Sequence, residues 1–281
     1  MVCADHTVTR EVFEIVRCSG CGFTFTNPRP QRNEIGRYYE SDEYISHSNT
    51  SRGIVNFVYQ IVRRYTIREK LRLMHVLAHN ARPETQNLLD IGCGTGEFLN
   101  ACHKEGWKVQ GIEPSPNARE FAVKRYNLKV GEEEELAKLP DASFDIITLW
   151  HVLEHVHDLD KRMNELNRLL ASRGAIVIAV PNCRSLDAEI YKEYWAAYDV
   201  PRHLYHFTPE TMTRLVHNYG MNIVDILPMR FDAFYVSMLS EKYKTGKANY
   251  LSGFFNGMKS NAATKKETIR YSSLMYVTRK V

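Results

Sequence analysis

The stretch Asp90–Gly96, which reads DIGCGTG, decides the fold of this 281-residue chain. It follows the apolar run Asn87–Leu89 and leads into a helical pattern, so it is predicted to form the bend between a strand and a helix. Glycines permit such a tight reversal, and their missing side chains let the backbone approach a bound molecule closely. The spacing is G-x-G-x-G, and Glu97 stands where the dinucleotide fingerprint G-x-G-x-x-G has its third glycine. That difference disfavours NAD as the ligand.

A second short strand and an acidic residue follow the glycine stretch. The apolar segment Val109–Ile112 ends in Glu113, directly before Pro114. A carboxylate accepts hydrogen bonds only, so it can bind both hydroxyls of a ribose, and dinucleotide folds place an acid at a similar distance. Glu113 therefore predicts a ribose-containing ligand without choosing among such ligands. The alternative is an ordinary solvated carboxylate in a loop.

The glycine stretch resembles motif I of the class I S-adenosylmethionine (AdoMet)-dependent methyltransferases, whose loop wraps the methionine half of AdoMet. The segment Phe144–Val156, FDIITLWHVLEHV, resembles motif IV in a bacterial subset of the same family. The resemblance implies that residues after three strands bind AdoMet. The cofactor-binding residues predicted in this way are Asp90, Gly92, Cys93, Gly94, Gly96, Glu113, Pro114, Leu149 and Trp150.

Strand and helix patterns alternate through the centre of the chain, as in the βαβ units that build a parallel sheet. The predicted strands are 87–91, 109–112, 129–130, 144–150, 175–180, 222–227 and 272–277. Gly106, Gly174 and Gly220 are predicted to end helices in the left-handed conformation. The resemblance implies an α/β, Rossmann-like methyltransferase fold, with a mostly parallel sheet and the last two strands as an antiparallel edge pair.

Two histidine-containing segments supply the candidate catalytic residues. His151 directly follows the strand Phe144–Trp150, and Arg202 and His203 lie in Trp195–Thr208, whose aromatic residues are typical of a pocket. The second segment resembles a PRHL.HFT stretch of the same bacterial subset. Either histidine is a candidate general base for a hydroxyl acceptor, and Arg202 is a candidate for holding an anionic substrate group. The alternatives are a structural or cofactor-lining His151 and a loop that only packs on the domain.

The residues His151, Glu154 and His155 also match H-x-x-E-H. In zinc peptidases of this pattern, two histidines one helical turn apart bind the metal and the glutamate activates water. That interpretation requires a third ligand and both histidines inside a helix. His151 directly follows a predicted strand, so the peptidase is a remote alternative.

The first thirty residues are predicted to form a separate, zinc-ribbon-like segment. Cys18 and Cys21 place two thiolates two residues apart on a turn that contains glycine, and Cys3 and His6 have C-x₂-H spacing. Since a tetrahedral site needs four ligands, Cys3, His6, Cys18 and Cys21 are the candidate ligands of a structural zinc ion. The methyltransferases that this segment resembles often carry another C-x₂-C further upstream. An incomplete segment without zinc is therefore the alternative.

Composition limits the remaining possibilities. Hydrophobic residues make up 44% of the chain, which is ample for a buried core, and the net charge of +4 does not require a polyanionic partner. No window approaches the roughly 18 apolar residues of a membrane span. Charged residues near the start interrupt any signal-peptide core, so a cytoplasmic location is expected. The six cysteines do not form a disulfide framework.

Four regions are predicted along the chain: the ribbon-like segment 1–30, a helical extension 31–84, the AdoMet-binding core 85–232, and a helical insertion with the last strand 233–281. Basic residues of the extension, Lys70 among them, are expected to face water or, alternatively, to line the substrate pocket. Basic and aromatic residues mix in 242–280, as on some nucleic-acid-binding surfaces. An amphipathic covering helix is favoured there, because four apolar residues fall at helical spacing. They are Leu251, Phe254, Phe255 and Met258.

The sequence thus predicts an AdoMet-dependent methyltransferase that acts on a small-molecule or glycan-type acceptor. Transfer from a sulfonium depends mainly on alignment, and a base matters when the acceptor is a hydroxyl. The histidines therefore favour O-methylation. The second hypothesis is a non-catalytic AdoMet-binding or zinc-dependent interaction protein with the same fold. Neither the acceptor nor the oligomeric state follows from the sequence.

Overall fold

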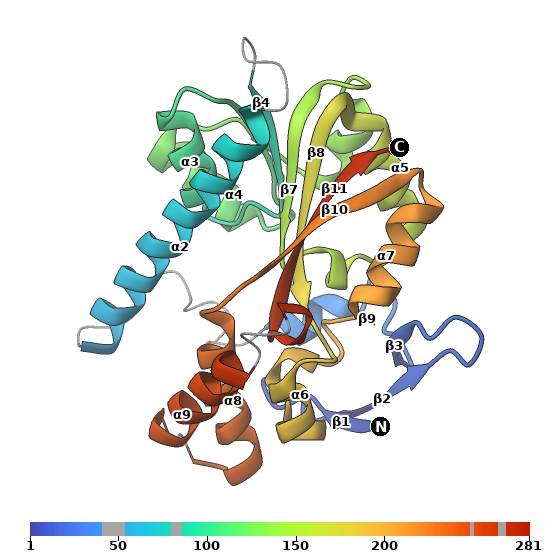
Figure 1. Cartoon of the computed structure of the whole chain (residues 1–281), viewed down its shortest axis with the longest axis vertical. Coiled ribbons are helices and arrows are strands. Elements are labelled where there is room, and N and C mark those ends of the chain that lie inside the picture. The colour runs from blue at the N-terminus through green and yellow to red at the C-terminus, as the bar shows by residue number, and fades with distance from the viewer. Residues whose placement is uncertain (41–53, 80–85, 248–249, 264–267) are drawn as a thin grey trace.

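A seven-stranded mixed sheet forms the centre of the molecule in a computed structural model that describes residues 1–40, 54–79, 86–247, 250–263 and 268–281 (Figure 1). Its order is β10-β11-β8-β7-β4-β5-β6. The strands are β4 (Asn87–Ile91), β5 (Lys108–Ile112), β6 (Val130–Gly131), β7 (Phe144–Trp150), β8 (Leu170–Pro181), β10 (Met221–Pro228) and β11 (Ser273–Lys280). Strands β6, β5, β4, β7 and β8 pair in parallel, whereas β11 is antiparallel to both β8 and β10. The predicted sheet with its antiparallel edge pair is confirmed.

Helices cover both faces of this sheet because successive strand residues point to opposite sides. Leu88 packs in a cluster with residues of α2 and α3, and its neighbour Leu89 packs in the cluster that contains residues of α5 and α7. Figure 1 shows α2 and α3 on one side of the sheet and α5 and α7 on the other. The helices are α2 (Ile54–His79), α3 (Glu97–Lys104), α4 (Pro116–Tyr126), α5 (Leu159–Leu169), α6 (Leu186–Tyr191), α7 (Pro209–Asn218), α8 (Asp232–Thr245) and α9 (Tyr250–Ala263).

Two of the three glycines predicted to end helices do so. Gly106 follows α3 with φ of 91°, and Gly220 follows α7 with φ of 67°. The prediction for Gly174 is wrong, because α5 ends earlier and Gly174 lies inside β8. A Cβ at this position would lie 2.6 Å from Cδ1 of Leu170. Gly174 therefore serves close packing within the sheet.

A second, four-stranded antiparallel sheet ties the start of the chain to the core. Its order is β1-β2-β3-β9, with β1 (Val2–Ala4), β2 (Val12–Arg17), β3 (Thr24–Asn27) and β9 (Tyr205–His206). Next to this pairing, the Thr26 hydroxyl donates a hydrogen bond to the carbonyl oxygen of His203 (2.6 Å). Because β9 comes from a distant part of the chain, the first thirty residues pack as part of one body with the core.

Helices α8 and α9 pack against each other through small residues. A Cβ on Gly253 would lie only 2.6 Å from Cα of Met238, so the two backbones are in close contact. The sequence predicts that an apolar stripe of α9 covers the core. Three of its members are 46–58% exposed, so the prediction that the stripe is buried is wrong for them: Phe254, Phe255 and Met258. The side chain of the fourth member, Leu251, lies outside the described set.

Replacing Gly253 by leucine is expected to lower the free energy of unfolding by about 1–3 kcal/mol, because the added side chain overpacks the contact with Met238. Phe255→Ala on the exposed face of the same helix serves as the control and should change stability by less than about 0.5 kcal/mol. Urea unfolding followed by circular dichroism measures both. Equal stability of the two variants would contradict the packing described here.

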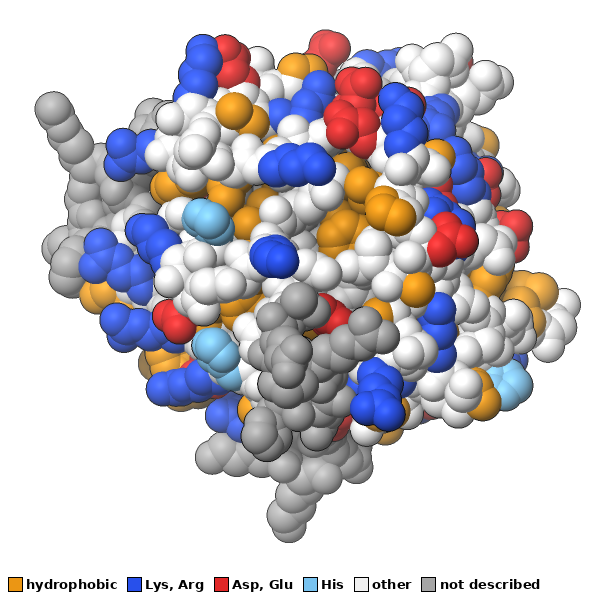
Figure 2. Space-filling view, turned by 90° about the horizontal axis from the view of Figure 1, so that it is seen from above, with side chains coloured by type: hydrophobic (Ala, Val, Ile, Leu, Met, Phe, Trp, Pro, Cys, Tyr) orange, Lys and Arg blue, Asp and Glu red, His pale blue; other side chains and the backbone are white. Residues whose placement is uncertain are grey.

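The surface shows mixed charge on the face seen from above. There, described Lys and Arg side chains are scattered among hydrophobic and neutral ones, with Asp and Glu between several of them (Figure 2). This pattern agrees with the small net charge of +4. Among the helices that the structure describes, none combines the length and apolarity needed to cross a bilayer.

Candidate functional site

The predicted cofactor-binding residues meet where the order of the sheet reverses. From β4 the chain continues through β5 to β6 on one side, and then crosses to β7 and β8 on the other. The loops after β4 and β7 diverge at this point, and open α/β sheets bind ligands outside the carboxyl ends of their strands there. Asp90, Glu113 and Trp150 all lie at these carboxyl ends.

The glycine loop after β4 has three glycines with positive φ, as the sequence pattern predicts. They serve different purposes. A Cβ on Gly92 would lie 2.3 Å from Cγ2 of Val152, and one on Gly96 would lie 2.9 Å from the Cβ of Ala122. A Cβ on Gly94 would meet no described atom within 4 Å. Gly92 and Gly96 therefore allow close packing, whereas the backbone at Gly94 is open to an incoming ligand.

Glu113 is fixed by two backbone amides. Its Oε2 accepts a hydrogen bond from the Gly94 amide (2.8 Å), and its Oε1 accepts one from the Ser115 amide (2.9 Å). The side chain is only 8% exposed, so the carboxylate has one orientation. Each carboxylate oxygen retains a further lone pair. Glu113 can therefore accept hydrogen bonds from two neighbouring hydroxyls of one ligand.

Asp90 is buried beneath the loop. Its Oδ1 accepts a hydrogen bond from the hydroxyl of Thr148 on the neighbouring strand (2.7 Å). Burial raises the pKa of Asp90 to about 7, against the opposing effects of the Thr148 hydrogen bond and the charge of Lys70. Asp90 therefore links the end of β4, where the glycine loop begins, to β7 through Thr148.

Lys70 lies at the site, although the sequence analysis predicted it only as one of several basic residues of the helical extension that face water or line the substrate pocket. Its Nζ lies 3.9 Å from the ring centroid of Trp150 and 5.6 Å from that of Phe98. Burial lowers the pKa of Lys70 to about 8, although Asp90 and Asp232 act in the opposite direction. No sequence signal marks this residue, because its helix precedes the glycine loop and meets the site only in the folded chain.

Leu149, Cys93 and Pro114 are the other predicted cofactor-binding residues whose side chains have a defined position. Leu149 is fully buried in the core cluster, so the prediction that its side chain flanks the cofactor is corrected. The thiol of Cys93 also packs inward, 2.7 Å from where a Cβ of Gly111 would lie, which leaves its backbone for the ligand. Pro114 is exposed, and its carbonyl accepts a hydrogen bond from Arg119 (2.8 Å).

His151 is held between two carboxylates. Its Nε2 lies 3.0 Å from Oδ2 of Asp232, and its Nδ1 lies 3.4 Å from Oε1 of Glu154. Burial lowers the pKa of His151, but Asp232 and Glu154 raise it more strongly, to about 10. His151 is therefore protonated at neutral pH, and the prediction that it acts as a general base is corrected.

The zinc-peptidase interpretation is wrong. The segment after β7 forms only the three-residue 3-10 helix η4 (Leu153–His155), and His151 precedes it with φ of 56°. The two histidines are therefore not one turn apart on an α-helix. Both ring nitrogens of His151 also face carboxylates of the chain itself.

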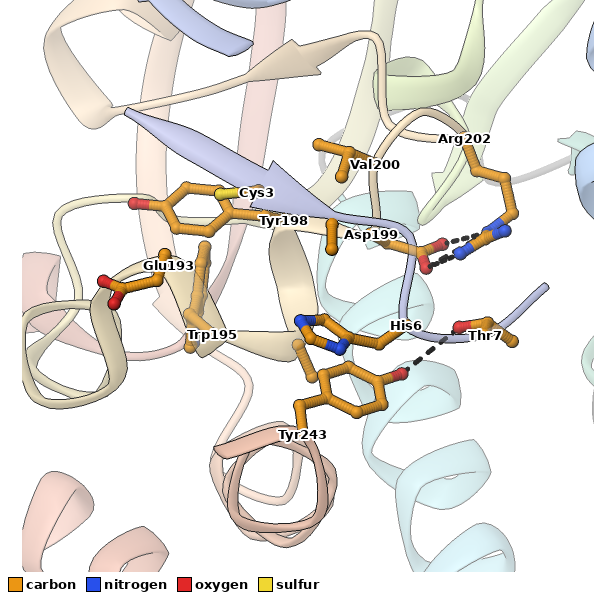
Figure 3. A pocket seen from close by; sticks show the side chains of 12 residues that line it. Cys3, His6, Thr7, Glu193, Trp195, Tyr198, Asp199, Val200, Arg202 and Tyr243 are labelled. Atoms are coloured by element: carbon orange, nitrogen blue, oxygen red, sulfur yellow. Dashed lines mark hydrogen bonds and ion pairs between the residues drawn. The ribbon is translucent and has the colours of Figure 1, made fainter. Parts of the chain in front are cut away.

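The guanidinium of Arg202 is committed to the fold. Its Nη2 pairs with Asp5 (3.0 Å) and Asp199 (2.7 Å), and its Nη1 donates to the carbonyl oxygen of Tyr38 (2.7 Å). Figure 3 shows the bonds between Arg202 and Asp199 beside a cavity of about 10 Å³, which has room for one water molecule. Arg202 is 1% exposed, so the prediction that it holds a substrate anion is corrected.

His203 and His155 lie against each other, with ring centroids 4.6 Å apart in an edge-on arrangement. Both are close to Glu154, which is fully buried. Burial raises the pKa of Glu154, but the three surrounding histidines lower it further, so its carboxylate is ionised. Burial also lowers the pKa of His155 to about 4, which keeps this ring neutral at pH 7. The sequence pattern predicted His203 as a candidate base. It gave Glu154 only the peptidase role, and it gave His155 either that role or local hydrogen bonds.

The four predicted zinc ligands do not come together. Cys3 pairs with Phe13 in the sheet, five residues along β2 from Cys18, which is a separation of roughly 17 Å. His6 lies beyond Cys3 in the opposite direction and stacks on Tyr243. Within the described ranges, the group of three or more metal-ligand side chains that the structure assembles is a different one: Glu154, His155 and His203.

Comparison with known proteins identifies related sequences. Residues 62–226 match the family model described as a methyltransferase domain. The chain is 30% identical over 132 residues to a malonyl-[acyl-carrier protein] O-methyltransferase of Serratia marcescens, with coverage of 46% of this chain and 51% of the relative. It is 27% identical over 184 residues to a ubiquinone biosynthesis O-methyltransferase of Cupriavidus pinatubonensis, with coverage of 60% and 72%. The alignment thus spans about half of the first relative.

Solved structures share the fold at low sequence identity. One is phosphoethanolamine N-methyltransferase 2 of Haemonchus contortus in complex with S-adenosyl-L-methionine, with a TM-score of 0.54, 18% identity, and coverage of 92% of this chain and 61% of that one. Another is geranyl diphosphate C-methyltransferase of Streptomyces coelicolor A3(2), with a TM-score of 0.53, 13% identity, and coverage of 76% and 80%. At these identities the likeness establishes the α/β Rossmann-like fold.

Proposed function

The chain belongs to the AdoMet-dependent methyltransferases, because the methyltransferase family model matches more than half of its length. We propose that it methylates an oxygen atom of a small-molecule or glycan-type acceptor. The names of the two curated relatives, both O-methyltransferases, support the choice of oxygen. AdoMet supplies the methyl group as an electrophile on a sulfonium.

The observation that carries this proposal is the carboxylate of Glu113 beside the open backbone at Gly94. Glu113 is oriented by two amides and has lone pairs for the two ribose hydroxyls of AdoMet. The absence of side-chain atoms at Gly94 gives the methionine half access to the loop. In this proposal the ring of Trp150, at the end of β7, lines the cofactor side of the site.

We assign the acceptor to the space beyond β7, next to His151. Methyl transfer requires the acceptor oxygen, the methyl carbon and the sulfur to lie in line, and such alignment alone contributes effective molarities of about 10⁵–10⁸ M. His151 is fixed by Asp232 and Glu154 from two sides, so it is suited to orient an acceptor. The C–S bond breaks as the O–C bond forms, and S-adenosylhomocysteine leaves. As a cation His151 only donates hydrogen bonds, so a hydroxyl acceptor loses its proton to water, whereas a carboxylate acceptor has no proton to lose.

Lys70 is proposed to bind the carboxylate of the methionine half of AdoMet. Replacing Lys70 by methionine keeps an unbranched side chain of similar length but removes the cation that lies over Trp150, and it is expected to weaken AdoMet binding about 10-fold, since one charge-assisted hydrogen bond is lost. Lys124→Met removes an exposed lysine from α4 and should leave affinity unchanged. Isothermal titration calorimetry measures both. Wild-type affinity of the Lys70 variant would refute this role.

The reaction itself is tested with AdoMet labelled in the methyl group and a panel of acceptors that offer hydroxyl, carboxyl, amine and activated carbon groups. We expect label in a methyl ether or methyl ester, identified by the carbon chemical shift of the new methyl group. Product formed only on nitrogen or carbon would contradict the proposed O-methylation while leaving the methyltransferase assignment intact.

A further inference from the structure

The carboxylate of Glu154 is fully buried, and its ion pair with His151 (3.4 Å from Nδ1 to Oε1) is its one side-chain partner within ion-pair distance among the described residues. The side chain is 0% exposed, and neither Oε1 nor Oε2 takes part in a hydrogen bond with any described residue. The contact with His151 balances the charge but leaves most lone pairs of a buried carboxylate without a hydrogen bond, and such groups usually point to a water molecule or an ion. The proposed acceptor site uses Glu154 only through its contact with His151, so the remaining acceptor capacity of this carboxylate needs a separate explanation.

The two neighbouring histidines have their tautomers fixed by backbone carbonyls. Nδ1 of His155 lies 3.0 Å from the carbonyl oxygen of Arg202, and Nδ1 of His203 lies 2.9 Å from that of Ala197. A carbonyl oxygen only accepts hydrogen bonds, so each Nδ1 carries the proton, and the Tyr39 hydroxyl (3.0 Å) then accepts from Nδ1 of His155 as well. In a neutral imidazole the other nitrogen, Nε2, then presents a lone pair. Each ring therefore has one nitrogen that no backbone carbonyl fixes, and that of His203 lies 3.9 Å from Oδ2 of Asp199.

This arrangement matches the way proteins support histidine ligands of metals. A ligating histidine almost always donates its other N–H to a carbonyl or a carboxylate, which fixes the ring and its tautomer. One carboxylate oxygen of Glu154 and one ring nitrogen each of His155 and His203 lie within 4.8 Å of one another. Donors around Zn²⁺ at about 2.0–2.2 Å stand roughly 3.4 Å apart, so the side chains need to close by at most about 1.5 Å.

We propose that Glu154, His155 and His203 form a binding site for one divalent transition-metal ion of the zinc type, with the carboxylate and both Nε2 atoms as ligands. Two imidazoles with one carboxylate form a donor set that such ions accept, whereas Mg²⁺ and Ca²⁺ prefer oxygen alone. The site is distinct from the predicted site of Cys3, His6, Cys18 and Cys21. It does not rest on the proposed acceptor.

The position of the cluster gives the ion a place in the fold. Glu154 and His155 belong to η4, which directly follows β7, and His203 belongs to the segment before β9. The amide of Leu204 also donates to the carbonyl oxygen of Glu154 (2.8 Å). An ion would therefore join two segments that the backbone already brings together. Its ligand Glu154 is two residues from Val152, which packs on Gly92 of the glycine loop.

The test is titration of the full chain with Co²⁺, whose visible absorption reports its coordination. The Cys18→Ser/Cys21→Ser background removes the exposed thiols that would also bind the ion. We expect one equivalent of Co²⁺ to bind with nitrogen and oxygen ligands and to be displaced by Zn²⁺. Glu154→Gln and His203→Ala should each weaken binding by at least about 100-fold. His217→Ala on the exposed face of α7 should leave it unchanged.

Two results would overturn the proposal. One is a folded protein that shows no change in Co²⁺ absorption up to about 1 mM, the limit of weak binding. The other is unchanged affinity in Glu154→Gln, which keeps the shape of the side chain and so tests the carboxylate with little disturbance of packing. Circular dichroism of each variant establishes that it is folded. A thiolate charge-transfer band would assign the ion to cysteine and would also contradict the proposed ligands.

Discussion

Glu113→Ala is expected to weaken the binding of AdoMet by about 100-fold or more. The variant loses two charge-assisted hydrogen bonds to the ribose, each worth about 1.5–3 kcal/mol, and every 1.4 kcal/mol corresponds to a factor of ten. It also releases the amides of Gly94 and Ser115, which the carboxylate now holds at 2.8 and 2.9 Å. Isothermal titration calorimetry with AdoMet and with S-adenosylhomocysteine measures the loss.

Two further variants separate ligand binding from disturbance of the loop. Glu113→Gln keeps the shape and one acceptor oxygen, so its affinity should fall between those of the wild type and Glu113→Ala. Glu120→Ala removes an exposed carboxylate from α4 and should bind AdoMet like the wild type. A Glu113→Ala protein that folds normally and binds AdoMet with unchanged affinity would exclude Glu113 as the ribose ligand.

Arg202→Met is expected to lower the free energy of unfolding by about 3–5 kcal/mol. The change removes the cation that lies between Asp5 and Asp199 and leaves two carboxylates uncompensated in the interior. A substrate-binding arginine would behave differently, because its loss would raise KM and leave stability nearly unchanged. Urea unfolding and steady-state kinetics therefore distinguish the two roles.

Controls exist for the Arg202 experiment as well. Arg202→Lys keeps the charge but not the forked geometry, so it should fold and lose less stability than the methionine variant. Arg184→Met breaks an exposed pair with Glu210 and should cost less than about 1 kcal/mol. A stable Arg202→Met enzyme with a raised KM would restore the role predicted from the sequence.

Local pattern was enough to predict most of the fold. The strands 87–91 and 144–150 were predicted with their observed bounds, because apolar residues predominate in both and polar or glycine residues flank them. The glycine loop and Glu113 follow from chemistry that depends on short spacing. Gly174 was misassigned because glycine marks close packing inside a strand as well as the end of a helix.

The site was less predictable where its contacts join distant parts of the chain. Arg202 looks like a substrate ligand in its own segment, but Asp5, at the other end of the sequence, neutralises it. His151 looks like a base until Asp232 of α8 is placed beside it. Cys3 and His6 have the spacing of zinc ligands, yet β1 directs them away from Cys18. Sequence spacing describes residues that are close along the chain, and it does not show which distant residues the fold brings into contact.

A crystal structure of the chain with S-adenosylhomocysteine is the most direct test of the proposed contacts at Glu113 and Gly94. We expect the two ribose hydroxyls within hydrogen-bond distance of Glu113, roughly 2.5–3.0 Å between oxygens, and the amino-acid half of the ligand along the backbone at Gly94. We also expect the sulfur to face the end of β7 near Trp150 and His151. A ligand bound elsewhere, with Glu113 still bonded only to its two amides, would contradict these proposed contacts.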